Sequence, residues 1–295
     1  MSAAAHRSFS LRRVLAIAQN TLTELTRLKV FSVILLFALL LIGSSAFMAK
    51  LTFQQELQVL KDISLGAISV LSSVLAVLAT ARLLPQELED RTIYTILAKP
   101  VERIEYLIGK LVGVLLLLAI SIGVMSVLFI SVLWLREQTV LNETARQMAN
   151  APADQLNDAL RSVRGSGFNF NLLPGIAIIY VKTALLASLT LFISTFASTN
   201  IFTVVTMLCV YFIGHLQGLA REYWLQSGTG TWLARLFLAL VALLFPDLQL
   251  FNLADDIVAG SVVPLTLFAK TAALGISYCA IYLLFAWAVF YRKEL

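Results

Sequence analysis

The chain has 295 residues, of which 59% are hydrophobic and only 13% are charged, and its formal net charge is +5. An ordinary soluble domain is about a quarter charged and under half apolar. This composition therefore excludes a soluble globular enzyme, and the long uncharged runs indicate a membrane protein instead. The modest net charge gives no reason to expect a nucleic-acid partner.

Uncharged runs along the chain predict six membrane-spanning helices. The longest run, 183–220, is long enough for two crossings if Ser198, Thr199 and Asn200 form the turn between them, since about 20 apolar residues cross the hydrocarbon core. All spans are expected to be helical, because an open strand leaves its backbone groups unsatisfied in lipid. The expected spans are about 30–49, 63–81, 111–135, 176–197, 201–220 and 271–291.

The fold class that follows is an all-α polytopic membrane protein. We expect residues 1–29 to form a connecting helix and 30–295 the transmembrane domain. A further apolar stretch within 232–246 is too short to span and is typical of a re-entrant or interfacial segment. Counting that stretch as a seventh span would place the two termini on opposite sides. With six spans, basic residues near the span ends favour both termini in the cytoplasm.

The first helix is expected over 9–29, because apolar residues recur there at helical spacing. Charged residues occupy much of its other side, among them Arg12, Arg13 and Arg27. This pattern indicates an amphipathic helix on the cytoplasmic leaflet, close to anionic lipid. A plain membrane anchor is the alternative.

The segment between the second and third spans carries the most information. Pro85 precedes an acidic turn that contains Glu87, Glu89 and Asp90, as a helix start prefers. The expected helix, 86–98, ends near Pro100, which disfavours helical geometry at the preceding residue. Two short helical pieces in a tight connection could form a rigid connector that transmits movement of a docked partner into two spans. The simpler interpretation is a charged cytoplasmic loop.

Outer loops are expected at 136–171, with a helix over about 139–163, and at 221–270. Lys182 lies within an apolar segment, where a charge suggests a functional site, but we favour snorkelling towards the outer interface. Two pairs of glycines at four-residue spacing, Gly109 with Gly113 and Gly214 with Gly218, allow close helix approach. These glycines could serve close packing within one subunit or a seam between two subunits, and the sequence does not decide between them.

No catalytic or metal site is expected. A phosphate-binding loop, the zinc-protease motif, Cys-x-x-Cys and Gly-x-Ser-x-Gly are all absent from the sequence. Asp247, Asp255 and Asp256 are too few to supply the six or more oxygens that hard cations prefer. The chain is therefore not expected to be an enzyme or to bind ATP.

The segment between the second and third spans contains a characteristic run of residues: Glu89, Asp90, Arg91, Thr92, Ile96, Leu97, Ala98, Lys99, Pro100, Val101, Arg103, Gly109 and Lys110. This run resembles the connector of ABC-2-type export permeases. That family's connector has an acidic residue, a Leu-Leu-x-Lys-Pro-Val-x-Arg core and a closing Gly-Lys. Arg91 stands where the family often has glycine, and the outer loop 136–171 is longer than in many relatives.

This resemblance implies a permease subunit of an ATP-driven exporter, in a homodimer or a heterodimer with a similar permease, in the bacterial inner membrane. A separate ATPase subunit would bind ATP and Mg²⁺, and this chain would hold no cofactor. Residues 86–104 would form the coupling segment that docks on the ATPase, and spans one, two and five would be candidates for the dimer seam. The resemblance does not identify the substrate.

Two other functions compete with this one. A membrane scaffold that recruits partners without transport would lack ATP-dependent flux. An ion-driven transporter is disfavoured because the expected spans lack buried carboxylates for proton or sodium coupling.

Overall fold

The computed structural model describes residues 9–50, 56–89, 102–149, 152–226, 232, 245–252, 257–258 and 263–292, and this described part of the chain contains helices and no strand. The elements in chain order are α1 (Leu11–Thr26), α2 (Lys29–Lys50), α3 (Glu56–Ala81), α4 (Leu83–Glu89), α6 (Arg103–Gln147), α7 (Ala153–Ser166), α8 (Leu172–Phe196), α9 (Asn200–Gln226), the 3-10 turn η1 (Leu248–Phe251) and α12 (Leu265–Arg292).

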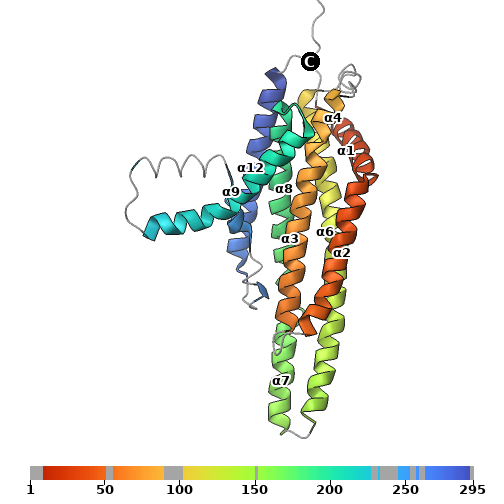
Figure 1. The fold of residues 1–295 in the computed structure, drawn as a ribbon, viewed down its shortest axis with the longest axis vertical. Coiled ribbons are helices and arrows are strands. Elements are labelled where there is room, and N and C mark those ends of the chain that lie inside the picture. Colours follow the sequence, from red (N-terminus) through yellow and green to blue (C-terminus); the bar gives the residue numbers. More distant parts are fainter. Residues whose placement is uncertain are drawn as a thin grey trace, which may run out of the picture.

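Six helices within the described residues are long and apolar enough to cross a membrane, which confirms the predicted fold class. They are α2, α3, α6, α8, α9 and α12, together with the short extension α4 after α3. Residues 197–199 separate α8 from α9, one position before the polar turn that was expected at 198–200. The start of α1 and the end of α12 lie at the same end of the bundle (Figure 1).

Helix α6 is much longer than the span expected within it. It contains 45 residues, which at 1.5 Å per residue is about 67 Å, more than twice a hydrocarbon core of about 30 Å. Figure 1 shows α6 running from the end where α1 begins to a projection beyond the other helices.

The expected single helix over 139–163 is wrong, because two helices share this stretch. Helix α6 ends at Gln147, Met148 caps it, and α7 begins at Ala153 after Pro152. Proline disfavours helical geometry at the residue before it. The expected single helix rested on the spacing of apolar residues alone and took no account of Pro152. The end of α6 and α7 form a helical hairpin (Figure 1), and Glu137 on α6 accepts a hydrogen bond of 3.0 Å from the backbone N–H of Phe168 just after α7.

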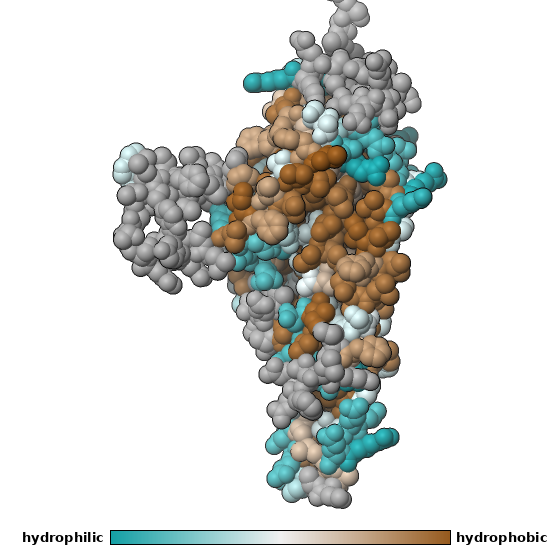
Figure 2. Space-filling view, viewed as in Figure 1, coloured by the Kyte–Doolittle hydropathy of each residue, from teal (hydrophilic) through white to brown (hydrophobic). Residues whose placement is uncertain are grey.

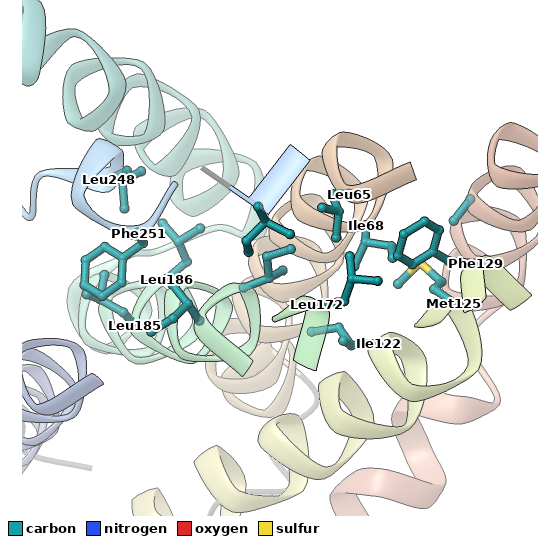
Figure 3. Packing of buried hydrophobic residues seen from close by; sticks show 14 of the residues in the cluster. Leu65, Ile68, Ile122, Met125, Phe129, Leu172, Leu185, Leu186, Leu248 and Phe251 are labelled. Atoms are coloured by element: carbon teal, nitrogen blue, oxygen red, sulfur yellow. The ribbon is translucent and has the colours of Figure 1, made fainter. Parts of the chain in front are cut away.

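The core is built around α8, which contacts α3, α6 and α12. Figure 3 shows Leu185 and Leu186 of this helix within the apolar cluster. Buried hydroxyls on the same helix donate to carbonyls of their own helix, as in the 2.8 Å bond from Ser188 and the 2.6 Å bond from Thr190. These local bonds let a hydroxyl enter an apolar interior without an unsatisfied group.

Helix α1 packs along the first turns of α6 rather than lying free on a surface. A Cβ added at Gly109 would lie 2.7 Å from Ile17 Cβ, and one at Gly113 would lie 2.7 Å from Thr21 Cβ. The glycine pair therefore permits the close approach of these two helices. Arg12 and Arg27 are exposed on α1.

The second glycine pair also packs within the chain. Gly214 and Gly218 of α9 lie against Leu248 and Gln249 of η1. Each of the four glycines thus has a close neighbour within the same chain. The C-terminal end of α9 leans away from the other helices (Figure 1).

We predict that Gly113→Ala destabilises the protein while Gly123→Ala does not. Both glycines lie in α6, but a Cβ at Gly113 would meet Thr21 and the Ala18 carbonyl, whereas a Cβ at Gly123 meets nothing within 4 Å. At Gly113 the added methyl group overpacks the helix contact, which costs about 1–3 kcal/mol. At both positions alanine also reduces the backbone freedom of the unfolded chain, which favours alanine over glycine in a helix by about 0.5–1 kcal/mol. Thermal unfolding of the detergent-solubilised proteins should show a lower Tm for Gly113→Ala alone. Equal Tm values would contradict the close α1–α6 packing.

Candidate functional site

Charged residues from α1, α4 and α6 meet beside the last turn of α12 at one end of the bundle, which we name the connector end. It comprises α1, the first turns of α6, all of α4, and the last turn of α12 (Figure 1). Helix α4 is anchored there by Leu83 and Leu84, which are buried in the apolar cluster that includes α6 residues. This packing fixes the polar side of α4 against α6.

The central contact of the connector end is an ion pair between Glu87 of α4 and Lys110 of α6. Tyr106, one turn before Lys110, donates its hydroxyl hydrogen to the same carboxylate. Lys110 also lies 3.7 Å from the carboxylate of Glu24 on α1, and its side chain is only 2% exposed. One buried ammonium group therefore connects three helices.

A second buried charge joins α1 to the start of α6. Glu105 is fully buried, and its carboxylate accepts hydrogen bonds of 2.8 Å from the Arg13 guanidinium and 2.7 Å from the Ser10 backbone N–H. The other oxygen accepts a bond of 3.3 Å from the backbone N–H of Glu102, which completes a capping box. The carboxylate thus satisfies the beginnings of two helices at once.

Helix α12 is held by Arg103. The guanidinium donates hydrogen bonds of 3.0 Å and 2.7 Å to the carbonyls of Phe290 and Tyr291. It also lies over both aromatic rings. A cation at a helix C-terminus complements the helix dipole. The Tyr106 ring stacks on Phe290 with a centroid distance of 6.0 Å, so α6 and α12 meet through both polar and aromatic contacts.

This arrangement suits mechanical linkage better than proton transfer. The carboxylates at Glu87 and Glu105 are occupied by basic or hydroxyl partners within the chain. Breaking a buried pair by removing one partner costs about 3–5 kcal/mol, so the four elements are expected to move together. Within the described residues no group of three or more His, Cys, Asp or Glu is placed to hold a metal ion.

The predicted residues of the connector and of the first helix fall into four groups. Glu87, Arg103 and Arg13 come together at the connector end, Glu89 ends α4, and Arg12 of α1 and the C-cap residue Arg27 are exposed. The remaining residues of the predicted coupling segment lie outside the described residues: Asp90, Arg91, Thr92, Leu97, Lys99 and Pro100.

The contacts that Glu105 and Tyr106 make with other helices were not predicted from the sequence. A local signal exists for both residues. Glu105 stands three positions after Glu102 at a helix start, and Tyr106 stands four positions before Lys110, on the same helix face. These spacings show which side chains are neighbours on α6, but their partners on α1, α4 and α12 depend on tertiary packing.

The prediction that the Lys182 side chain snorkels towards the outer interface is wrong. Its side chain is buried within the bundle, and Nζ lies 3.3 Å from Ser69 Oγ and 3.4 Å from His215 Nε2. The physical reason is that α3 and α9 provide polar partners beside α8, which a single helix pattern cannot show.

A comparison with protein families accounts for this architecture. The family model described as ABC-2 family transporter protein matches residues 14–295. The chain belongs to the ABC-2 transporter family. A search of curated proteins finds no match. As an ABC-2 family member, the chain is an integral membrane protein and a permease component of an ABC transport system, a component that is typically not catalytic itself.

We predict that Glu87 and Lys110 of this ABC-2 permease are energetically coupled. Glu87→Gln and Lys110→Met should each lower the unfolding free energy by about 3 kcal/mol, because each leaves a buried charge without its partner. The double variant should lose clearly less than the sum of the two single losses. Detergent-induced unfolding of the four proteins measures this coupling. The exposed Arg12→Gln, expected within about 0.5 kcal/mol of wild type, is the control, and additive losses would contradict the prediction.

Proposed function

We propose that this chain is the membrane subunit of an ATP-driven exporter, and that residues 86–104 transmit movement from a separate ATPase subunit. The observation that carries the proposal is the set of buried polar contacts around Glu87, Glu105 and Arg103. These contacts connect both flanks of the connector, α4 and the start of α6, to α1 and α12.

A displacement of the connector would reach the membrane helices through two routes. On one side, α4 follows α3 directly and Glu87 is paired with α6. On the other side, Arg103 holds the last turn of α12. Packed helices shift between discrete arrangements rather than deforming continuously, so a small displacement can be amplified into a change of packing. We infer that this change alternates access between the two sides of the membrane.

The proposed orientation places the connector end in the cytoplasm of a bacterium, with the membrane being the inner membrane. Several basic residues lie close to span ends there, among them Arg12, Arg27, Arg82, Arg103 and Arg292. Such a bias favours the cytoplasmic side. Both termini would then be cytoplasmic, and the α6–α7 hairpin would project from the outer face.

We propose that the permease acts as a dimer, with α2, α3 and α9 at the seam. Large apolar side chains are exposed on these helices, including Phe37, Val70 and Phe212. An apolar cavity of about 290 Å³ also lies between them, lined by Phe31, Leu75 and Val204 among others. ATP and Mg²⁺ would be bound by the ATPase subunits, because this sequence contains no phosphate-binding loop.

Purification in mild detergent from the native host tests the subunit composition. We expect a phosphate-loop ATPase to copurify with this chain in equal stoichiometry and to hydrolyse ATP. Recovery of this chain without an ATPase, in several detergents, would favour the scaffold function instead.

We predict that the triple variant Glu87→Ala, Glu89→Ala, Asp90→Ala reduces stimulation of the ATPase and transport by at least about tenfold while still inserting into the membrane. The matched control is Glu143→Ala, Asp154→Ala, Asp158→Ala, which changes the charge equally at exposed positions on the hairpin. ATP hydrolysis by reconstituted complexes and membrane insertion are measured for both. Normal stimulation in the connector variant would remove these residues from the coupling role.

A further inference from the structure

A polar cavity lies between α3, α8, α9 and the segment around η1, well away from the connector end. Its volume is about 220 Å³, and its lining includes Ser69, Lys182, Tyr211 and His215. Lys182 lies ten residues after the start of α8, so it is about 15 Å along that helix. Figure 2 shows hydrophilic surface within the apolar band beside the crossing of α9 and α3.

Lys182 differs from Lys110 and Arg136 in its electrostatic surroundings, while Lys61, which is also buried without an ion pair among the described residues, has the charge of Glu137 nearby. Lys110 is paired with Glu87, and Arg136 lies 2.6 Å from the carboxylate of Glu56. Lys182 is 3% exposed, yet within the described part of the chain no carboxylate lies at ion-pair distance from its Nζ. Burying a charge without a counter-charge is costly, and an intramembrane ionisable residue suggests a functional site.

The hydrogen bonds around Lys182 leave its ammonium group able to bind an acceptor. Nδ1 of His215 lies 3.0 Å from the Tyr211 carbonyl, which assigns the Nδ1 hydrogen to that bond and leaves Nε2 as an acceptor in the neutral ring. Lys182 can therefore donate to His215 Nε2 and to Ser69 Oγ. An ammonium group has three N–H donors, so one donor has no partner among the described residues.

The remaining groups of the cavity are compatible with an anion next to Lys182. Asp62 also lines the cavity, but it lies seven residues before Ser69 on α3, about 10 Å along the helix axis. Its carboxylate is exposed, so it is hydrated rather than paired with the buried ammonium. Tyr211 places the face of its ring 5.8 Å from Lys182 Nζ, which stabilises a cation at this position without neutralising it.

We propose that this cavity binds an oxyanion, a carboxylate or a phosphate, of the molecule that the permease transports. The ammonium of Lys182 supplies the counter-charge, and Ser69 and His215 hold it in position. The volume admits an anionic group rather than a drug-sized molecule, since such molecules occupy sites of about 300–1,000 Å³. This inference deepens the proposed export function by naming the substrate class, and its transport part rests on that function.

The anion could belong to a membrane amphiphile or to a small soluble molecule. The cavity wall includes Val70, which is 49% exposed on α3 among apolar side chains. A ligand that enters past this residue, from the bilayer along the apolar surface of the proposed dimer seam, would carry an apolar chain. A ligand that enters past Asp62 and Asn252 would come from the aqueous side. The two sources share the same recognition chemistry and are separated by the choice of probe.

Isothermal titration of the purified full-length chain in neutral dodecyl maltoside tests the site directly, without ATP or the ATPase. The probes are dodecyl phosphate, inorganic phosphate and uncharged dodecanol. We expect dodecyl phosphate or inorganic phosphate to bind, and dodecanol to bind at least about tenfold more weakly than the anionic probe. Saturable binding of dodecyl phosphate alone identifies an amphiphile, whereas comparable binding of inorganic phosphate identifies a soluble anion.

Variants assign the binding to Lys182. Lys182→Gln should weaken binding of the anionic probe at least about tenfold, and Lys182→Arg should keep it within about threefold, because the arginine retains charge and donors. The control Lys270→Gln removes the same charge at an exposed position of α12 and should leave binding unchanged. Lys182→Arg and the control Lys270→Gln also show whether a loss of binding reflects the charge at Lys182 or a general loss of folding.

The outcomes for the site and for the exporter are distinguishable. Equal binding by wild type and Lys182→Gln, or no binding of either anionic probe to the wild type, would overturn the anion site even if an ATPase copurifies and transport occurs. Binding that depends on Lys182 supports the site whether or not ATP-dependent flux is found. Absence of such flux in a complex with its ATPase would overturn only the assignment of the bound anion as a transported substrate.

Discussion

Hydrocarbon offers no partner to a backbone N–H or carbonyl, and the rest of this structure depends on that constraint. Every described span is a helix, so the backbone is satisfied locally and helices differ mainly in the side chains they present. The hydroxyls of Ser188 and Thr190 follow the same rule, since they bond to carbonyls of their own helix. Charged side chains cannot be satisfied in this local way, and their positions therefore determine how the helices are joined.

Two kinds of buried charge result, and they suit different roles. At the connector end, Glu87 and Lys110 neutralise each other, and Glu105 is neutralised by Arg13, which favours a single fixed arrangement of α1, α4 and α6. Lys182 is held only by neutral partners, Ser69 and His215. A paired charge already has its counter-charge within the chain, whereas a lone buried charge gains most when a molecule of opposite charge arrives.

The sequence predicted the six spans and the interruption near Ser198, because uncharged length and a polar interruption are properties of one segment. It predicted Glu87 and Arg103 as members of a functional segment through the family resemblance. It did not predict that Lys182 is buried, since burial depends on which face of α8 meets α3 and α9. The partners of Glu105 could not be predicted from the sequence either, because Arg13 lies 92 positions away along the chain.

The length of α6 has a mechanical consequence for the whole molecule. This single helix begins at the contacts of Glu105 and Lys110 and ends beside α7, and residues 103–147 contain no proline at which it would bend sharply. A rod that pivots within the bilayer displaces its two ends in opposite directions. In the proposed orientation, such a pivot would move the tip of the hairpin on one side of the membrane whenever the charged contacts on the other side shift.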